Sequence, residues 1–200
     1  MTVKAIIKEI WEWLVVFVSA FVLVMFLNVT VFATTQVRQT YMKNTLVEGE
    51  HLLVEKVSYL FSNPERGDII IFLDNKHNTS YFSRYAVFLK DVSEIFKPPE
   101  ARTNIRLVKR VIGVPGDEVD IRDGKVYING EVLEEPYTIG QTTKREISFP
   151  VKVPEGKYFV LGDNREASRD SRSFGFIDKD QIEGKAVFRI WPLNKISVIK

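Results

Sequence analysis

An uncharged stretch from Trp13 to Val37 constrains the fold of this chain more than any other feature of its sequence. Its core, residues 14–27, consists almost entirely of Leu, Val, Phe, Met and Ala. A helix needs roughly 20 apolar residues to cross the hydrocarbon layer of a membrane. Trp11 and Trp13 stand at the start of the stretch, where indole side chains favour the boundary between membrane and water. The sequence therefore predicts one membrane-spanning helix near the N-terminus.

The residues around this stretch predict the orientation of the chain. Lys4 and Lys8 precede it, and positively charged residues favour the cytoplasmic side. A cleaved signal peptide would have an apolar region of roughly 7–15 residues followed by a small-x-small site, which residues 31–35 do not provide. A buried core helix is the other alternative to an uncleaved anchor. We expect residues 1–35 to form a cytoplasmic N-terminus and a single anchor in the cell membrane, with residues 36–200 as an extracellular domain.

Composition excludes several kinds of site. The formal net charge of +2 does not indicate the basic patch that nucleic-acid-binding domains carry, so we expect no nucleic-acid partner. The absence of cysteine excludes disulfide bonds, thiolate zinc sites and a cysteine nucleophile. The two histidines, His51 and His77, are too few for most histidine-based metal sites, and no motif supports a Ser-His-Asp triad. We therefore expect neither a metal nor a cofactor.

Short segments of alternating or apolar residues follow the anchor and predict a mainly β fold. The dipeptide Asp123-Gly124 separates residues 119–121 from residues 126–128, which predicts a tight hairpin. The other predicted strands are residues 52–57, 68–73, 105–114, 131–133, 158–161 and 186–190.

Residues 75–104 depart from this β pattern. Apolar residues recur at helical spacing between Tyr85 and Phe96, at positions 85, 88, 89, 92, 95 and 96, and Pro98-Pro99 then stops the helix. We interpret residues 75–104 as an insertion with one helix. It is either a surface excursion or a docking element for a partner or for the membrane surface.

Four stretches, in order along the chain, match the motifs of one protein family. They are residues 37–50 (VRQTYMKNTLVEGE), 66–72 (RGDIIIF), 109–117 (KRVIGVPGD) and 162–175 (GDNREASRDSRSFG). Together they resemble the type I signal peptidases of the Gram-positive type, which are membrane-bound serine proteases that remove signal peptides.

This resemblance implies a signal-peptidase-like antiparallel β domain with an exposed apolar surface near the membrane. It also implies a cleft that binds the extended end of a signal peptide by strand addition, with shallow pockets for small side chains. The expected partners are therefore signal peptides or exported precursor proteins, pilus precursors included, together with membrane lipid.

The third stretch places Lys109 where the family carries its catalytic lysine, the general base. A lysine must be neutral to take a proton from a serine hydroxyl, whereas a free lysine has a pKa of about 10.4. Burial among apolar groups lowers that pKa. Lys109 shortly precedes Val111 and Ile112 in an alternating segment, which is compatible with burial.

The first stretch departs from the family at its nucleophile. Met42 and Leu46 fix the alignment, which puts Tyr41 in the position of the nucleophilic serine. Asn44 replaces the family's proline, and Gln39 stands where Gly or Ser is usual. A tyrosine oxygen lies several bonds farther from the main chain than a serine oxygen, and a misplacement of about 1 Å can cost roughly 100-fold in rate. Beside a lysine, we expect the phenol to form a hydrogen bond or a partial phenolate pair instead.

The fourth stretch contains the expected supporting residues. The resemblance implies that Ser168 forms hydrogen bonds near the lysine and that Asp163 and Arg165 belong to the scaffold. It also implies that Asp170 pairs with an arginine, either Arg165 or Arg172. That pair is expected to hold the loop that carries Ser168.

Two functional hypotheses follow. In the first, the chain is a peptidase-deficient relative that binds secreted or pilus proteins, because Tyr41 replaces the serine; some Gram-positive relatives without catalytic residues assist pilus assembly. In the second, it is an active signal peptidase that cleaves secreted precursors with an altered nucleophile, which is Tyr41, the adjacent Thr40 or another, repositioned hydroxyl. A self-cleaving repressor-type protease shares the Ser/Lys chemistry, but the anchor and the lack of a DNA-binding segment argue against it.

Overall fold

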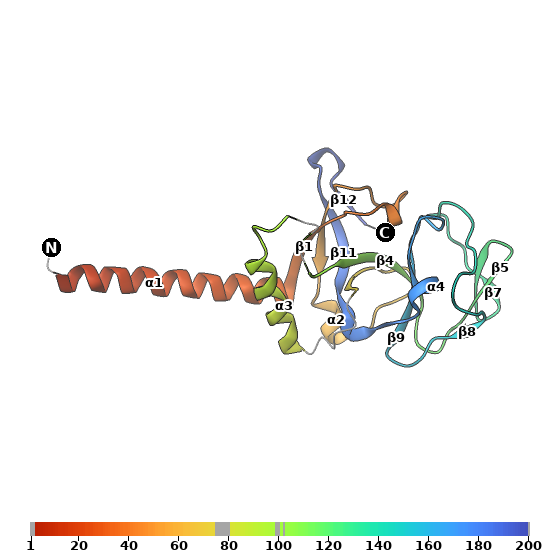
Figure 1. Cartoon of the computed structure of the whole chain (residues 1–200), viewed down its shortest axis with the longest axis horizontal. Helices are drawn as coiled ribbons and strands as arrows, with labels where there is room; N and C mark the ends of the chain where they lie inside the picture. The colour runs from red at the N-terminus through yellow and green to blue at the C-terminus, as the bar shows by residue number, and fades with distance from the viewer. Residues whose placement is uncertain (1–2, 75–80, 99–100, 102, 200) are drawn as a thin grey trace.

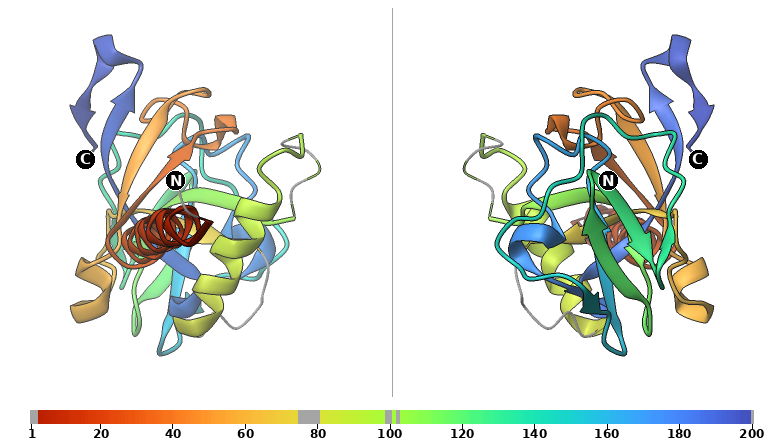
Figure 2. Two further views of the ribbon diagram at one scale, coloured as in Figure 1. Left: turned by 90° about the vertical axis from the view of Figure 1, so that its left-hand side faces the viewer. Right: turned by 90° about the vertical axis from the view of Figure 1, so that its right-hand side faces the viewer.

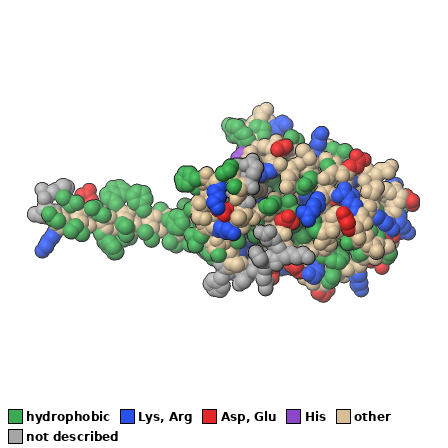
Figure 3. Space-filling model, viewed as in Figure 1, with side chains coloured by type: hydrophobic (Ala, Val, Ile, Leu, Met, Phe, Trp, Pro, Cys, Tyr) green, Lys and Arg blue, Asp and Glu red, His purple; other side chains and the backbone are tan. Residues whose placement is uncertain are grey.

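The computed structural model describes residues 3–74, 81–98, 101 and 103–199, with only the main chain at residues 81 and 82. Helix α1 (Val3–Phe26) continues through a π-helical turn, Leu27–Val31, directly into strand β1 (Phe32–Gln36). Figure 1 shows this helix standing out from one end of the β domain. No residue of α1 is buried, and its apolar side chains cover the projecting rod in Figure 3. The continuous helix of 29 residues is long and apolar enough to cross a membrane.

Two sheets form the domain. The larger sheet is ordered β1-β2-β11-β3-β4-β9-β10, with β12 paired to β11, and the smaller is ordered β7-β6-β5-β8. Every pairing between these named strands is antiparallel, which confirms the predicted mainly antiparallel β fold. The remaining strands are β2 (His51–Glu55), β3 (Ile69–Leu73), β4 (Arg106–Gly113), β5 (Glu118–Arg122), β6 (Lys125–Ile128), β7 (Glu131–Val132), β8 (Val151–Lys152), β9 (Lys157–Leu161), β10 (Ile177–Asp178), β11 (Ile182–Trp191) and β12 (Ser197–Val198). The short helices α2 (Ser58–Phe61) and α4 (Ser171–Phe174) lie in connecting segments.

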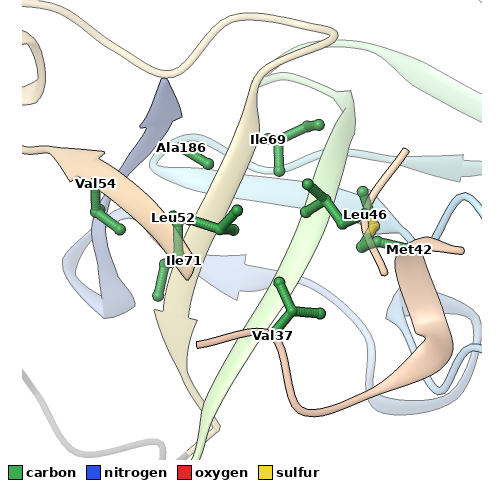
Figure 4. Close-up of a cluster of buried hydrophobic side chains, with 8 residues drawn as sticks. All are labelled: Val37, Met42, Leu46, Leu52, Val54, Ile69, Ile71 and Ala186. Atoms are coloured by element: carbon green, nitrogen blue, oxygen red, sulfur yellow. The ribbon is translucent and has the colours of Figure 1, made fainter. Parts of the chain in front are cut away.

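Strand β3 runs through the core of the larger sheet, because all five of its residues are buried. Successive side chains of a strand point to opposite faces. Ile69 and Ile71 therefore pack into one apolar cluster, whereas Ile70 and Phe72 pack into a second. Figure 4 shows the first cluster, which also contains buried side chains from the segment that holds Tyr41. The packing of these side chains in the core therefore fixes the position of the segment that holds Tyr41.

The turns of the smaller sheet confirm the predicted hairpin. Asp123 and Gly124, between β5 and β6, have φ angles of 51° and 76°. Two adjacent residues with positive φ form the type I′ turn, whose twist matches that of the flanking strands. Asn129 and Gly130 repeat this conformation between β6 and β7.

Helix α3 spans Tyr81–Ser93, earlier than the helix predicted between residues 85 and 96. The buried carboxylate of Glu94 accepts a hydrogen bond from the Thr103 main-chain N–H at 2.9 Å, which directs the chain back toward β4. Two views agree that α3 lies beside the outer end of α1 (Figures 1 and 2). Of the insertion predicted at residues 75–104, residues 75–80, 99–100 and 102 lie outside the described residues.

Candidate active site and the adjoining groove

Lys109 lies in the middle of β4 and is fully buried. Ile70 of β3 stands opposite it, and the second half of β4 pairs with β9. Burial lowers the pKa of the Lys109 amine from 10.5 to about 7, although the negative charges of Asp170 and Asp74 oppose the shift. The amine is thereby held near the protonation state that a general base needs.

Tyr41 places the face of its ring, rather than its hydroxyl, against this lysine. Lys109 Nζ lies 4.1 Å from the centroid of the Tyr41 ring. Tyr41 belongs to a short 3-10 turn, Thr40–Met42, and the buried Met42 side chain anchors that turn in the core. No hydrogen bond joins the phenol to the amine among the contacts of the described residues. The ring-face contact therefore takes the place of the predicted hydrogen bond or phenolate pair.

No hydroxyl of the described residues forms a hydrogen bond with the Lys109 amine. Lys109 Nζ donates to the carbonyl oxygen of Val108 at 3.3 Å. The Thr45 hydroxyl donates to a neighbouring carboxylate, and Thr40 is exposed. Ser168 is buried, but its Oγ has no hydrogen-bond partner among the described residues. The site thus contains the base, but no hydroxyl of the described residues is hydrogen-bonded to it.

Hydrogen bonds fix the Tyr41 turn against the fourth motif. The Asn164 main-chain N–H donates to the Tyr41 carbonyl oxygen at 2.9 Å, and Asn164 Nδ2 donates to the Thr40 carbonyl oxygen at 3.2 Å. Gly162 lies so close that a Cβ there would clash with the Tyr41 carbonyl oxygen and with Ser168. Glycine at this position allows the two loops to approach each other. Sequence reasoning placed this segment in the scaffold without identifying its contact with Tyr41.

Asn44 adopts a main-chain conformation that proline, the family's residue at this position, cannot adopt. Its φ is 98°, whereas the ring of proline holds φ near −65°. Asparagine tolerates the left-handed region because its short polar side chain can form a compensating hydrogen bond. Here Asn44 Nδ2 donates to the Tyr137 carbonyl oxygen at 3.0 Å. The departures at positions 41 and 44 therefore belong to one altered loop.

The Asp163 carboxylate forms hydrogen bonds with residues of several segments next to this loop. It accepts two hydrogen bonds from Arg110, at 2.9 and 3.0 Å, and one from the Thr45 hydroxyl. The Arg110 guanidinium also lies over the Tyr137 ring, 3.8 Å from its centroid. Both members of the ion pair are buried, and buried charges require such partners. Sequence reasoning missed Arg110, although it directly follows Lys109 in the third motif.

Arg172 is the residue that pairs with Asp170. Its Nε and Nη2 atoms each donate to the Asp170 carboxylate at 2.8 Å, and both side chains are fully buried. Arg165 instead pairs with Glu135, a partner that sequence reasoning missed. The Asp170–Arg172 pair stands at the start of α4 and holds the loop that carries Ser168.

A groove of about 720 Å³ opens beside Tyr41. Its walls are β1 with the segment up to Met42, the residues before and in the first half of β4, and one face of α3. Strand β1 ends the strand order of its sheet, so one of its edges has no partner among the described strands. The Val37 N–H bonds across the paired edge, and main-chain groups alternate in direction along a strand. Thr34 and Gln36 therefore present their main-chain groups at the free edge, ready to pair with an extended peptide.

Comparisons with known proteins bear on this site. The family described as "Signal peptidase, peptidase S26" matches residues 10–191. Signal peptidase IB of Staphylococcus aureus strain COL is 35% identical over 204 aligned residues, which cover 94% of this chain and 93% of that protein. Probable signal peptidase I-2 of Synechocystis is 34% identical over 182 residues, 91% of this chain and 73% of that protein. A crystal structure of a signal peptidase I from Enterococcus faecalis V583 is 33% identical, with 62% of this chain and 97% of that chain covered and a TM-score of 0.39.

Proposed function

Because this chain belongs to the signal peptidase family, peptidase S26, which acts in the processing of exported proteins, we propose that it binds exported precursors without cleaving them. The observation that carries the proposal is the Tyr41 ring over Lys109 Nζ. In this proposal α1 anchors the chain in the cell membrane with its N-terminus in the cytoplasm. Residues 1–35 are then the cytoplasmic N-terminus and anchor, and residues 36–200 work outside.

The chemistry of a Ser/Lys peptidase explains why the ring matters. The serine oxygen attacks the scissile carbonyl carbon while a neutral lysine accepts the serine proton. This proton transfer requires the serine oxygen and the lysine nitrogen to lie within about 2.6–3.2 Å of each other. Over Lys109 that space is filled by aromatic carbons, and the phenol oxygen lies at the far end of the ring from the main chain. The base is retained, but the atom it would activate is displaced.

The free edge of β1 supports binding as the remaining activity. A precursor in extended conformation can add a strand to this edge, so that main-chain hydrogen bonds supply affinity and adjacent pockets supply specificity. Thr34 and Gln36 offer the main-chain groups that such a strand would pair with. Secreted precursors and pilus precursors are the two client classes that the family resemblance suggests.

The lowered pKa of Lys109 favours a second candidate function, an active peptidase with an altered nucleophile. In that case the hydroxyl of Tyr41 or Thr40 would form an ester with an acylating inhibitor. Mass spectrometry of the inhibited protein would locate this adduct. We expect no adduct on either residue at saturating inhibitor.

Binding without cleavage can be tested on the full-length protein in liposomes. The probe is a fluorescent precursor peptide with an apolar segment followed by an Ala-x-Ala sequence. We expect saturable binding, and we expect the peptide to keep its intact mass after long incubation. Lys109-dependent appearance of cleaved product would contradict the proposal.

A pair of variants at Gln36 tests strand addition. Gln36→Pro removes the main-chain donor at the free edge, and proline is tolerated at an edge strand because the paired edge keeps its hydrogen bonds. Gln36→Ala keeps the donor and removes only the side chain. We expect Gln36→Pro to weaken binding by about ten-fold or more, whereas Gln36→Ala binds nearly as the wild type does. Equal binding by both variants would exclude pairing at β1.

A further inference from the structure

We propose that the apolar face of α3 receives the apolar segment of a client that is still held in the membrane, and so selects which precursors enter the groove. This inference rests on the proposed function, because it assumes that the client pairs with β1. It assigns a specificity-determining role to an element outside the motifs that resemble signal peptidases. The predicted alternatives for this insertion were a surface excursion or a docking element, and the groove favours docking.

One face of α3 lines the groove. Its lining residues follow the helical spacing i, i+3, i+4, i+7, i+8 and i+11, which places them on a single stripe. They are Arg84, Val87, Phe88, Asp91, Val92 and Ile95, the last just beyond the end of the helix. This stripe differs from the predicted one, since Leu89 points away from the groove and is 50% exposed.

The polar members of the stripe are already bound to the domain. Arg84 Nη2 donates to the Ile182 carbonyl oxygen at 3.1 Å. Asp91 pairs with Arg106 at 2.7 Å, and Arg106 also pairs with Glu183 at 2.6 Å. These contacts fasten α3 to the sheet and leave its apolar side chains to face the groove. Along α3, an occupant therefore contacts apolar side chains, while the charged side chains of the stripe are already paired within the domain.

The apolar members of the stripe are only partly covered. A surface helix normally buries its apolar stripe against the core. Here Val87 and Phe88 are half-buried, while Val92 and Ile95 are 39% and 59% exposed. The space next to them is the groove. Burial of these side chains by an apolar segment would stabilise the complex.

The groove begins at the level of the membrane anchor. Asn28 and Val29, at the outer end of the helical rod, line it. The Phe88 ring lies 6.5 Å from the ring of Phe21, which is well inside the apolar stretch of α1. Figures 1 and 2 show α3 alongside α1 at this end of the domain. A peptide that leaves the bilayer beside α1 therefore reaches α3 before it reaches Tyr41, which identifies the occupant as the membrane-held apolar segment of a precursor.

Photocrosslinking from three positions of the full-length protein in liposomes tests this inference. p-Benzoylphenylalanine replaces Phe88 on the groove face, Leu89 on the opposite face, or Thr34 on the β1 edge. The probe is a membrane-inserted peptide with a Leu-rich segment followed by Ala-x-Ala. We expect crosslinks to the peptide from positions 88 and 34, competed by unlabelled peptide, and none from position 89. Crosslinks from position 34 alone would overturn the inference while leaving the proposed function intact, and crosslinks from neither would overturn both.

Binding by matched serine variants gives a second readout. Phe88→Ser should weaken binding of the full peptide by about ten-fold or more, because a large apolar contact is lost. The same variant should bind a peptide without the Leu-rich segment as the wild type does, which separates the lost contact from damage to the groove. Leu89→Ser should bind both peptides normally. Equal losses for the two peptides, or no loss for either, would contradict a role of α3 in selection.

Discussion

At Lys109 two influences on the pKa oppose each other, and their sizes decide the protonation state. The Tyr41 ring favours the ammonium form by about 0.5–2 kcal/mol. The shift of the pKa from 10.5 to about 7 corresponds to roughly 5 kcal/mol in favour of the neutral amine. Desolvation therefore prevails and holds the pKa of the Lys109 amine well below 10.5.

The buried lysine makes stability depend on pH. Between pH values of about 7 and 10.5 the unfolded chain binds a proton at Lys109 that the folded chain does not, so the free energy of unfolding rises with pH. Lys109→Met removes this dependence, and its gain in stability over the wild type is expected to be largest near pH 7 and below. The gain should shrink by up to about 1.4 kcal/mol for each pH unit as the pH rises through this window. Denaturant unfolding of both detergent-solubilised proteins at several pH values measures the stability difference between Lys109→Met and the wild type. A difference that grows with pH would contradict a buried neutral amine at Lys109.

Asn44 offers a test of the altered loop. Asn44→Pro forces φ away from 98° and is expected to cost about 1–3 kcal/mol of stability. Asn44→Gly is the matched control, because it loses the same side-chain hydrogen bond but tolerates positive φ. Thermal unfolding of both variants compares them. If proline were accepted as readily as glycine, the left-handed conformation at this position would be wrong.

Residues inside a motif could be placed from sequence, whereas their conformations could not. The motif alignment located Tyr41 and Lys109, and the structure brings them into contact. The ring-face geometry depends on the turn that Met42 anchors in the core, and the positive φ of Asn44 depends on a bond to Tyr137 far along the chain. Neither is encoded in the local pattern.

At the scale of elements, strands and hairpins were predictable because alternation and turn dipeptides are local signals. The existence of α3 was also predictable, since its apolar residues recur at helical spacing. Its bounds and its groove-facing stripe were not, because they are set by contacts distant in sequence, such as Asp91 with Arg106 and Arg84 with Ile182. The order of strands in the larger sheet was not predictable either, because it also depends on contacts between residues distant in sequence.

The loop before α4 depends on one buried ion pair. Arg172→Met leaves the Asp170 carboxylate buried without its partner, and such a loss typically costs about 3–5 kcal/mol. Arg169→Met is the control, because its side chain is 63% exposed and its pair with Asp74 is long, at 3.8 Å. That exposed change is expected to cost less than about 1 kcal/mol. Unfolding in denaturant measures both, and equal costs would show that the buried pair does not hold the loop.

At the scale of the whole molecule, helix α1 leads directly into the groove, because it continues into strand β1, which lines the groove. Helix α1 runs through its π-helical turn into β1 without a linker, so the free edge of β1 begins where the apolar helix ends. Helix α3 adds an apolar wall at the same level. Under the proposed function, this continuity places the groove at the membrane surface. The separate sequence motifs could not convey it.

Binding without cleavage is tested most directly by the turnover of a membrane-anchored precursor by the full-length wild type and by Tyr41→Ser in the same liposomes. We expect no Lys109-dependent product from the wild type. We expect slow turnover by Tyr41→Ser, because a serine oxygen there would lie on the main-chain side of the space now filled by the ring, and loss of that turnover in Tyr41→Ser/Lys109→Met. Wild-type turnover equal to that of Tyr41→Ser, and abolished by Lys109→Met, would show that the Tyr41 ring does not block cleavage.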